Sequence, residues 1–190
     1  MAVKLVKPIN HKKVVKITNQ DFEAKMRELR VNSDIAVAVS GGPDSLALMH
    51  LSNRYALNNN INLTVLSIDH GMRAESSKEI VWLKKVAKKN KINFYSTKLK
   101  KKINSSNTLS KARTLRYEAL SKYCNKKKIK FLLTAHHLDD EIENFLMRLI
   151  RGSGVKGLSS LKVKSRYKNT KLILVRPLLE YSKKSLVAYL

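Results

Sequence analysis

Residues 35–51 of the chain read IAVAVSGGPDSLALMHL, and this stretch predicts the fold. Residues 35–39 are apolar and small or β-branched, which is typical of a strand buried on both faces of a parallel sheet. The polar segment 40–45 ends this run and is expected to form a tight loop. Apolar residues at helical spacing follow at Leu46, Leu48, Met49 and Leu51. The stretch therefore predicts a strand, a loop and a helix in that order.

The same alternation continues to the end of the chain. Further strands are predicted at 63–69, 93–99, 130–135 and 172–175, with helices between them and a last helix capped by Ser182. Alternation of this kind predicts an α/β fold, a doubly wound and mainly parallel five-stranded sheet with helices on both faces. We expect residues 1–30 to form an N-terminal extension with a helix, and residues 31–190 to form the main domain.

The charge of the chain favours a polyanionic partner. Lys and Arg number 39 and Asp and Glu number 14, which gives a formal net charge of +25. Such a surplus repels itself in the folded state, and nucleic acid is the partner that best neutralises it. A composition biased towards Lys and Asn is the alternative explanation.

Composition also excludes several classes of protein. The single cysteine, Cys124, rules out an intramolecular disulfide, a cysteine-based zinc site and a Cys-x-x-Cys redox pair. No apolar run approaches the roughly 18 residues of a membrane span. We therefore expect a protein of the cytoplasm, or of an organelle stroma or matrix if an organelle encodes it, that has no membrane partner.

Polar residues follow four of the predicted strands, at the edge where open parallel sheets bind ligands. They are Ser40 to Ser45, Asp69-His70-Gly71, His136-His137 with Asp139-Asp140, and Arg176. Two glycines, two serines and a helix N-terminus in the first loop suit a phosphate, although an ordinary turn between a strand and a helix has a similar composition. The loop is neither a Walker A motif nor a Gly-x-Gly-x-x-Gly fingerprint.

Segment 40–45 also matches the Ser-Gly-Gly-x-Asp-Ser signature of the PP-loop ATP pyrophosphatases. Within that superfamily the chain most resembles the tRNA(Ile)-lysidine synthetases, over about residues 35–190. The residues that carry this resemblance are Asp69 to Arg73, Ala112-Arg113, Arg116-Tyr117, Thr134 to Asp140 with Glu143, Arg148, Arg151 to Gly154, and Arg176 to Leu179.

The resemblance implies an adenine-nucleotide α-hydrolase fold and an ATP-dependent ligase of tRNA processing. In that family the wobble cytidine of the isoleucine tRNA with a CAU anticodon attacks the α-phosphate of ATP through its O2 atom, and pyrophosphate leaves. The amine of free L-lysine then displaces AMP at C2, which gives lysidine. ATP and Mg²⁺ are thus the expected cofactors, and the tRNA and lysine are the expected partners.

The resemblance also implies roles for individual residues. ATP would be bound by Ser40, Gly41, Gly42, Pro43, Asp44, Ser45, Asp69 and His137. The catalytic residues would be Asp44, Arg113, Asp140 and Glu143, of which Asp44 is also the candidate Mg²⁺ ligand. The last two stand three residues apart on the predicted helix 138–150, where paired carboxylates would suit the cationic lysine substrate. The roles of Arg116 and Arg176 are left open.

Two departures from the family pattern leave alternatives open. Asn144 stands where the family usually has Thr, and the chain ends at Leu190 where the family continues, so the sequence is a fragment or a minimal form. One alternative is a basic RNA-binding module with a vestigial nucleotide site. The other is a different PP-loop tRNA-modifying enzyme such as a thiolase, although Cys124 alone supplies few of the thiols that sulfur transfer needs.

Overall fold

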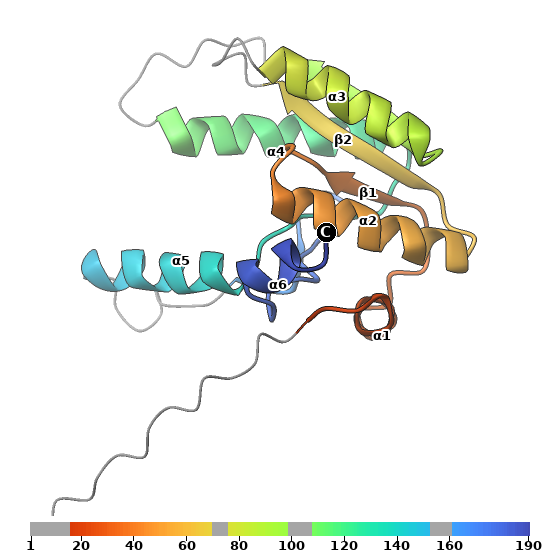
Figure 1. The fold of residues 1–190 in the computed structure, drawn as a ribbon. Helices are drawn as coiled ribbons and strands as arrows, with labels where there is room; N and C mark the ends of the chain where they lie inside the picture. Colours follow the sequence, from red (N-terminus) through yellow and green to blue (C-terminus); the bar gives the residue numbers. More distant parts are fainter. Residues whose placement is uncertain (1–15, 70–75, 99–107, 153–160) are drawn as a thin grey trace, which may run out of the picture.

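The computed structural model describes residues 16–69, 76–98, 108–152 and 161–190, which form a layered α/β domain (Figure 1). The helices are α1 (Asn19–Glu28), α2 (Pro43–Asn58), α3 (Ser76–Lys89), α4 (Thr108–Lys126), α5 (Leu138–Ile150) and α6 (Lys183–Val187). The strands are β1 (Ile35–Ala38), β2 (Leu63–Asp69), β3 (Asn93–Lys98), β4 (Phe131–Leu133), β5 (Lys164–Arg166) and β6 (Ile173–Val175).

The six strands form one sheet in the order β3-β2-β1-β4-β6-β5. Its first five strands are parallel, and Val37 at the centre pairs with Val65 of β2 and Leu133 of β4. Strands β2 and β3 lie on one side of β1, whereas β4 and the strands that follow it in the chain lie on the other side. The strand order therefore reverses at β1, and a crevice opens there at the carboxyl ends of β1 and β4, where ligands of doubly wound folds bind.

The predicted fold class is confirmed, and the predicted number of strands is corrected from five to six. The strand that sequence analysis missed is β5, which pairs antiparallel with β6 at the edge of the sheet. Its residues, Lys164, Ser165 and Arg166, are polar and partly exposed. An edge strand with no apolar alternation carries no periodic signal that distinguishes it from a loop.

Apolar side chains cover both faces of the sheet, as the alternation of β1 requires. Ile35 and Val37 point into a core shared with α1, α2, α3 and α6, whereas Ala36 faces a second core built with α4. Helix α1 contributes Phe22 and Met26, both fully buried, to the first of these cores. The proposed boundary between residues 30 and 31 stays a prediction.

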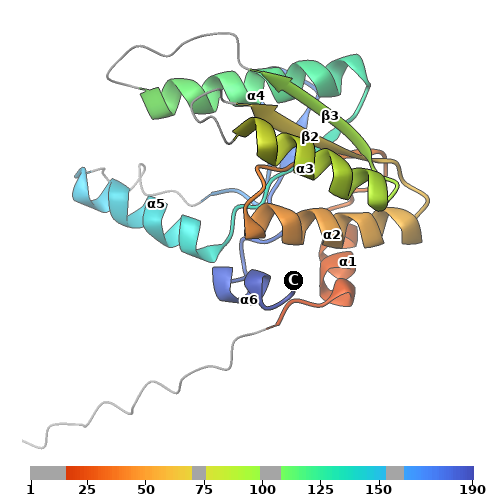
Figure 2. The same cartoon turned by 45° about the horizontal axis from the view of Figure 1, so that its top comes forward.

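Helix α5 differs from the other long helices because none of its residues is buried. It extends away from the sheet in two views of the ribbon (Figures 1 and 2). Its apolar side chains, including Phe145 and Leu149, remain exposed in the structure. The amphipathic pattern thus predicted the helix, but no part of the described chain buries its apolar side.

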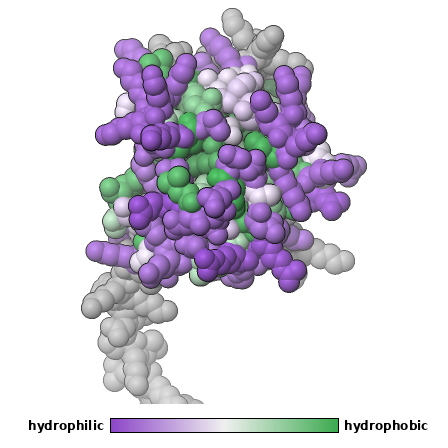
Figure 3. All heavy atoms as spheres, turned by 90° about the vertical axis from the view of Figure 1, so that its right-hand side faces the viewer, coloured by the Kyte–Doolittle hydropathy of each residue, from purple (hydrophilic) through white to green (hydrophobic). Residues whose placement is uncertain are grey.

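One face of the molecule is drawn with all its heavy atoms in Figure 3, and most side chains on it are hydrophilic. Figure 3 shows the face on the right-hand side of Figure 1, where hydrophilic residues surround smaller apolar areas. Among the residues that the structure describes, no helix is long and apolar enough to cross a membrane.

Candidate functional site

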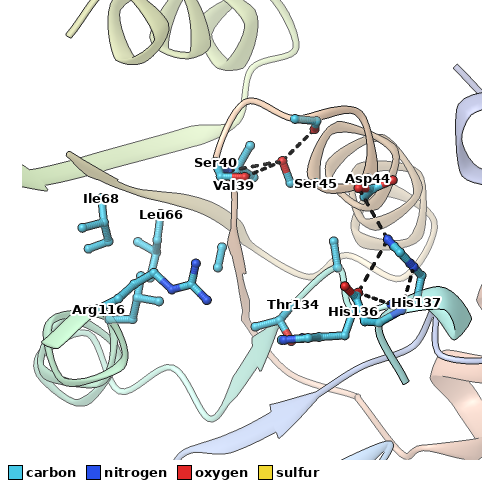
Figure 4. A pocket seen from close by; sticks show the side chains of 15 residues that line it. Val39, Ser40, Asp44, Ser45, Leu66, Ile68, Arg116, Thr134, His136 and His137 are labelled. Atoms are coloured by element: carbon cyan, nitrogen blue, oxygen red, sulfur yellow. Dashed lines mark hydrogen bonds and ion pairs between the residues drawn. The ribbon is translucent and has the colours of Figure 1, made fainter. Parts of the chain in front are cut away.

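A pocket lies in the crevice at the carboxyl ends of β1 and β4 (Figure 4). Four parts of the chain line it: the end of β1 with the loop into α2, strand β2, helix α4, and the segment from β4 into α5. The lining residues are Ala38, Val39, Ser40, Gly42, Asp44, Ser45, Leu66, Ile68, Arg116, Leu120, Thr134, Ala135, His136, His137 and Asp140. Segments about 90 residues apart in sequence thus meet because the strands that carry them are neighbours.

The loop after β1 leaves the N-terminus of α2 open towards the pocket. Gly41 has a φ of +93°, a conformation that side chains with a Cβ atom rarely adopt. Gly42 is the N-cap and supplies no side-chain hydrogen bond, and Pro43 occupies the first turn. The uncapped N–H groups and the helix dipole favour an anion at this position.

Ser45 fixes the shape of this loop. Its Oγ donates a hydrogen bond to the Gly42 carbonyl (2.8 Å) and accepts one from the Ser40 N–H (3.2 Å). The Ser40 and Ser45 hydroxyl oxygens lie 3.4 Å apart. Because the buried Ser45 closes the turn through the backbone, Ser40 has the more accessible hydroxyl for a phosphate.

Asp44 carries a buried polar atom in the pocket that has no hydrogen-bond partner. Its Oδ1 is buried and has no hydrogen-bond partner, and its Oδ2 lies 3.6 Å from His137 Nε2. A buried carboxylate oxygen without a partner is costly, so a cation or a donor is expected to complete it. In the described ranges no cluster of three or more His, Cys, Asp or Glu residues could hold a metal. The unpartnered Asp44 Oδ1 fits Mg²⁺, because one or two carboxylates together with phosphate oxygens and water commonly hold this ion.

His137 joins the two motifs of the site. It is the N-cap of α5, where Nδ1 accepts from the Asp140 N–H (3.4 Å) and Asp140 Oδ2 accepts from the His137 N–H (2.9 Å). With Nδ1 accepting, a neutral ring carries its proton on Nε2, which lies 3.6 Å from a carboxylate oxygen of both Asp44 and Asp140. The ring thus orients two of the predicted site residues.

His136 points the other way, towards cations (Figure 4). Its Nδ1 lies 2.9 Å from Thr134 Oγ1 and its Nε2 lies 3.4 Å from an Arg113 nitrogen, which can only donate. Burial, followed by the charges of Arg176 and Arg113, lowers the pKa of His136 to about 4. The imidazole is therefore neutral at pH 7 and carries its proton on Nδ1.

The two arginines of α4 occupy different environments. Arg116 lines the pocket and has a buried Nε without a hydrogen-bond partner, and Figure 4 shows its side chain reaching into the cavity. Arg113 is exposed and reaches the site only through His136. Arg176 lies outside the lining and donates to the Lys162 carbonyl (2.7 Å), so it fastens β6 to the segment before β5.

The structure brings together most of the predicted site residues. Ser40, Gly42, Asp44, Ser45, His137 and Asp140 line one pocket. Gly41, Pro43, Asp69, Arg113 and Glu143 do not line it, although the first two shape the loop. Asp69 ends β2, and Glu143 is exposed one turn beyond Asp140. The motif segments 70–73, 153 and 154 lie outside the described residues.

Sequence analysis left two pocket residues without a role. The resemblance gave Arg113 a catalytic role and left the role of Arg116 open, and the two stand one helical turn apart on the same helix. His136 was among the polar residues expected after the strand at 130–135, but it was given no role in the site. Only the direction of its side chain places it in the pocket, and the same holds for the choice between the two arginines.

Cys124 does not line this pocket. It is fully buried in the core that α4 shares with the sheet, and burial raises the pKa of its thiol to about 12. A thiol in such surroundings stays protonated and is a poor nucleophile or metal ligand.

Comparisons with known proteins agree with this geometry. The profile of a family described as the PP-loop domain matches residues 10–190. The tRNA(Ile)-lysidine synthase of Rickettsia bellii (strain OSU 85-389) is 48% identical over 158 residues, which are 83% of this chain and 36% of that protein. The enzyme of the same name from Rickettsia typhi (strain ATCC VR-144 / Wilmington) is 41% identical over 174 residues, 90% of this chain and 40% of that protein.

A solved structure supports the fold. The U34-tRNA thiolase NcsA from Methanococcus maripaludis, determined with its [4Fe-4S] cluster, superimposes with a TM-score of 0.74 at 24% identity. The superposition covers 90% of this chain and 62% of the thiolase chain.

The chain spans about two fifths of the length of the two curated lysidine synthases that it matches.

Proposed function

The chain belongs to the PP-loop domain family, and on that premise we propose that it catalyses ATP-dependent formation of lysidine in a tRNA. The proposed reaction joins free lysine to C2 of the wobble cytidine in the isoleucine tRNA whose anticodon is CAU. ATP is converted to AMP and pyrophosphate. The similarity to lysidine synthases over most of this chain supports the assignment.

The first proposed step is adenylation of the cytidine. The O2 atom of the base attacks the α-phosphorus of ATP, a P–O bond to the β-phosphate breaks, and pyrophosphate leaves. The open N-terminus of α2 with Ser40 suits the β- and γ-phosphates. Arg116, whose Nε has no partner inside the pocket, is suited to the negative charge that develops at the α-phosphate.

The second proposed step is displacement of AMP by lysine. The uncharged side-chain amine attacks C2, the C2–O bond to the adenylate breaks, and the amine loses a proton. Lysine arrives protonated at pH 7 because its pKa in water is about 10.4. Asp140 lies in the pocket and Glu143 stands one turn further along α5, so carboxylates there would first bind the ammonium and then accept its proton.

Asp44 is the proposed Mg²⁺ ligand. The ion would lower the repulsion between the phosphates and the attacking oxygen. Asp44 suits this role because its Oδ1 is buried without a partner. Its other carboxylate oxygen, Oδ2, lies 3.6 Å from His137 Nε2.

The observation that carries the proposal is the meeting of two motifs in one pocket, where Asp44 lies 3.6 Å from His137. The test is AMP formation from ATP by this chain, with and without a CAU-anticodon isoleucine tRNA transcript, and with and without lysine. AMP release that needs both, with mass-spectrometric detection of lysidine, is the expected result. Turnover with neither dependence would overturn the assignment.

A further inference from the structure

Helix α3 has an outer face that the proposed site does not use. Its inner face buries Leu83 and Ala87 against the sheet. On the outer face, Trp82 is 47% exposed and Val81 is 56% exposed. Trp82 and Val81 are neighbours, so they form a small exposed apolar area that can serve as a contact surface.

The exposed indole belongs to a shallow hollow on the helix. The hollow is lined by Lys78, Val81, Trp82 and Lys85. These residues stand at positions i, i+3, i+4 and i+7, so they form one stripe along α3. The stripe is separate from the pocket at β1 and β4, with which it shares no residue.

The stripe carries two lysines, Lys78 and Lys85, on a strongly positive helix. Helix α3 contains five lysines, at positions 78, 84, 85, 88 and 89, and one acidic residue, Glu79. Within the described part of the chain, neither Lys78 nor Lys85 forms an ion pair with a carboxylate. A flat aromatic ring between two unpaired ammonium groups is complementary to a nucleobase with its flanking phosphates.

The position of α3 relates the stripe to the pocket. Helix α3 follows β2, so its first turn lies at the carboxyl edge of the sheet, the edge that holds the pocket (Figures 1 and 2). Lys78 stands in that first turn. An RNA chain with one nucleotide at the pocket could therefore continue over the outer face of α3.

Two other classes of partner fit the stripe less well. A membrane-bound helix buries a broad apolar face, whereas only Val81 and Trp82 are apolar among the lining residues here. An acidic protein would suit the lysines, but it does not account for the net charge of +25 over the whole chain as well as a polyanion does.

We propose that the outer face of α3 is an RNA-docking site, where Trp82 stacks on an unpaired base and Lys78 and Lys85 contact the phosphates beside it. The inference rests on the proposed function because it takes the substrate to be an RNA. The outer face of α3 would be a second region of the protein, outside the nucleotide pocket, that contacts the same RNA.

The test uses the fact that Trp82 is the only tryptophan in the chain. Titration with the tRNA transcript, or with a short single-stranded RNA, is expected to quench its fluorescence saturably, and less at higher salt. Trp82→Ala is expected to weaken RNA binding, measured by filter retention, about tenfold, and Trp82→Phe to restore most of it. Circular dichroism checks that both variants fold.

A charge-matched control separates the stripe from general charge. Lys78→Ala with Lys85→Ala is expected to lower the slope of log K against log salt by roughly 1 to 2. Lys126→Ala with Lys127→Ala removes the same charge from exposed positions at the end of α4 and just beyond it, at the opposite edge of the sheet. It is expected to change that slope less.

Several results would overturn the docking site. One is RNA binding that leaves the tryptophan fluorescence of the unchanged protein constant, together with an RNA affinity of Trp82→Ala equal to that of the unchanged protein. Another is quenching by an acidic peptide or by anionic vesicles but not by RNA. Lysidine formation without RNA-dependent quenching would reject the docking site alone, whereas quenching without AMP formation would support it and reject the proposed reaction.

Discussion

Asp44 Oδ2 and His137 Nε2 lie 3.6 Å apart, although 93 residues separate them in the chain. The contact joins the loop after β1 to the start of α5, the two segments that carry the chemical motifs. Both residues stand just after neighbouring parallel strands, so the pairing of β1 with β4 creates the contact. The first prediction follows from the other oxygen of Asp44, which is buried without a partner.

Asp44→Asn is expected to lower AMP formation from ATP by about 10²-fold or more, because it removes the negative charge that the proposed cation and phosphates require. Thermal unfolding should stay close to that of the unchanged protein, since Oδ1 makes no hydrogen bond. Asp34→Asn, at an exposed position that hydrogen-bonds Asn62, serves as the control. Unchanged AMP formation in Asp44→Asn would contradict the role of Asp44.

The two arginines of α4 are expected to differ in their effect. Arg116→Met should lower the rate of AMP formation about 10²-fold, because Arg116 lines the pocket with an unsatisfied Nε. Arg113→Met should lower it less than tenfold, because Arg113 is exposed. Single-turnover kinetics with saturating ATP compares the two variants. A larger loss in Arg113→Met would restore Arg113 as the main catalytic arginine.

Glu143→Gln tests the proposed recognition of lysine. Loss of one carboxylate contact to an ammonium is expected to raise KM for lysine about tenfold while KM for ATP changes less than twofold. Glu143 is exposed, so its substitution is expected to leave the fold unchanged, and Glu141→Gln on the same helix provides a charge-matched control. An equal loss of lysine and ATP binding would argue against this role.

His136 is expected to make stability depend on pH. Its pKa is about 4 in the folded protein, below the ordinary value of 6.5, so the unfolded chain binds a proton between these values and the folded chain does not. The stabilisation is present above pH 6.5 and is lost as the pH falls towards 4. Between pH 7 and pH 5 this group should cost about 2 kcal/mol of unfolding free energy.

His136→Gln should remove that part of the pH dependence, measured by urea unfolding at pH 7, 6 and 5. His50→Gln, on α2 and outside the pocket lining, controls for the loss of an imidazole elsewhere. If the slope of stability against pH in His136→Gln equals that of the unchanged protein, the histidine is not held neutral by its surroundings.

Much of the fold could be predicted from local sequence. The strand at Ile35, the loop at Gly41 and the helix that contains Leu46 were each expected, because strand alternation, glycine and helical spacing act within a few residues. The helix begins at Pro43, three residues earlier than the spacing indicated, because proline suits the first turn of a helix. The N-cap role of Ser182 was also confirmed, since its side chain accepts from the Ser185 N–H. The short polar strand β5 was missed, because only pairing with β6 makes it a strand.

The sequence by itself determined the order of the elements, the chemical character of the loop after β1 and the positive charge of the chain. Only the tertiary structure decided that His137 contacts Asp44, that Arg116 rather than Arg113 lines the pocket, and that Glu143 stays outside it. The physical reason is the range of the forces involved. Helix and strand periods arise from backbone geometry over a few residues, whereas the order of strands, and hence which side chains meet, depends on packing between distant segments.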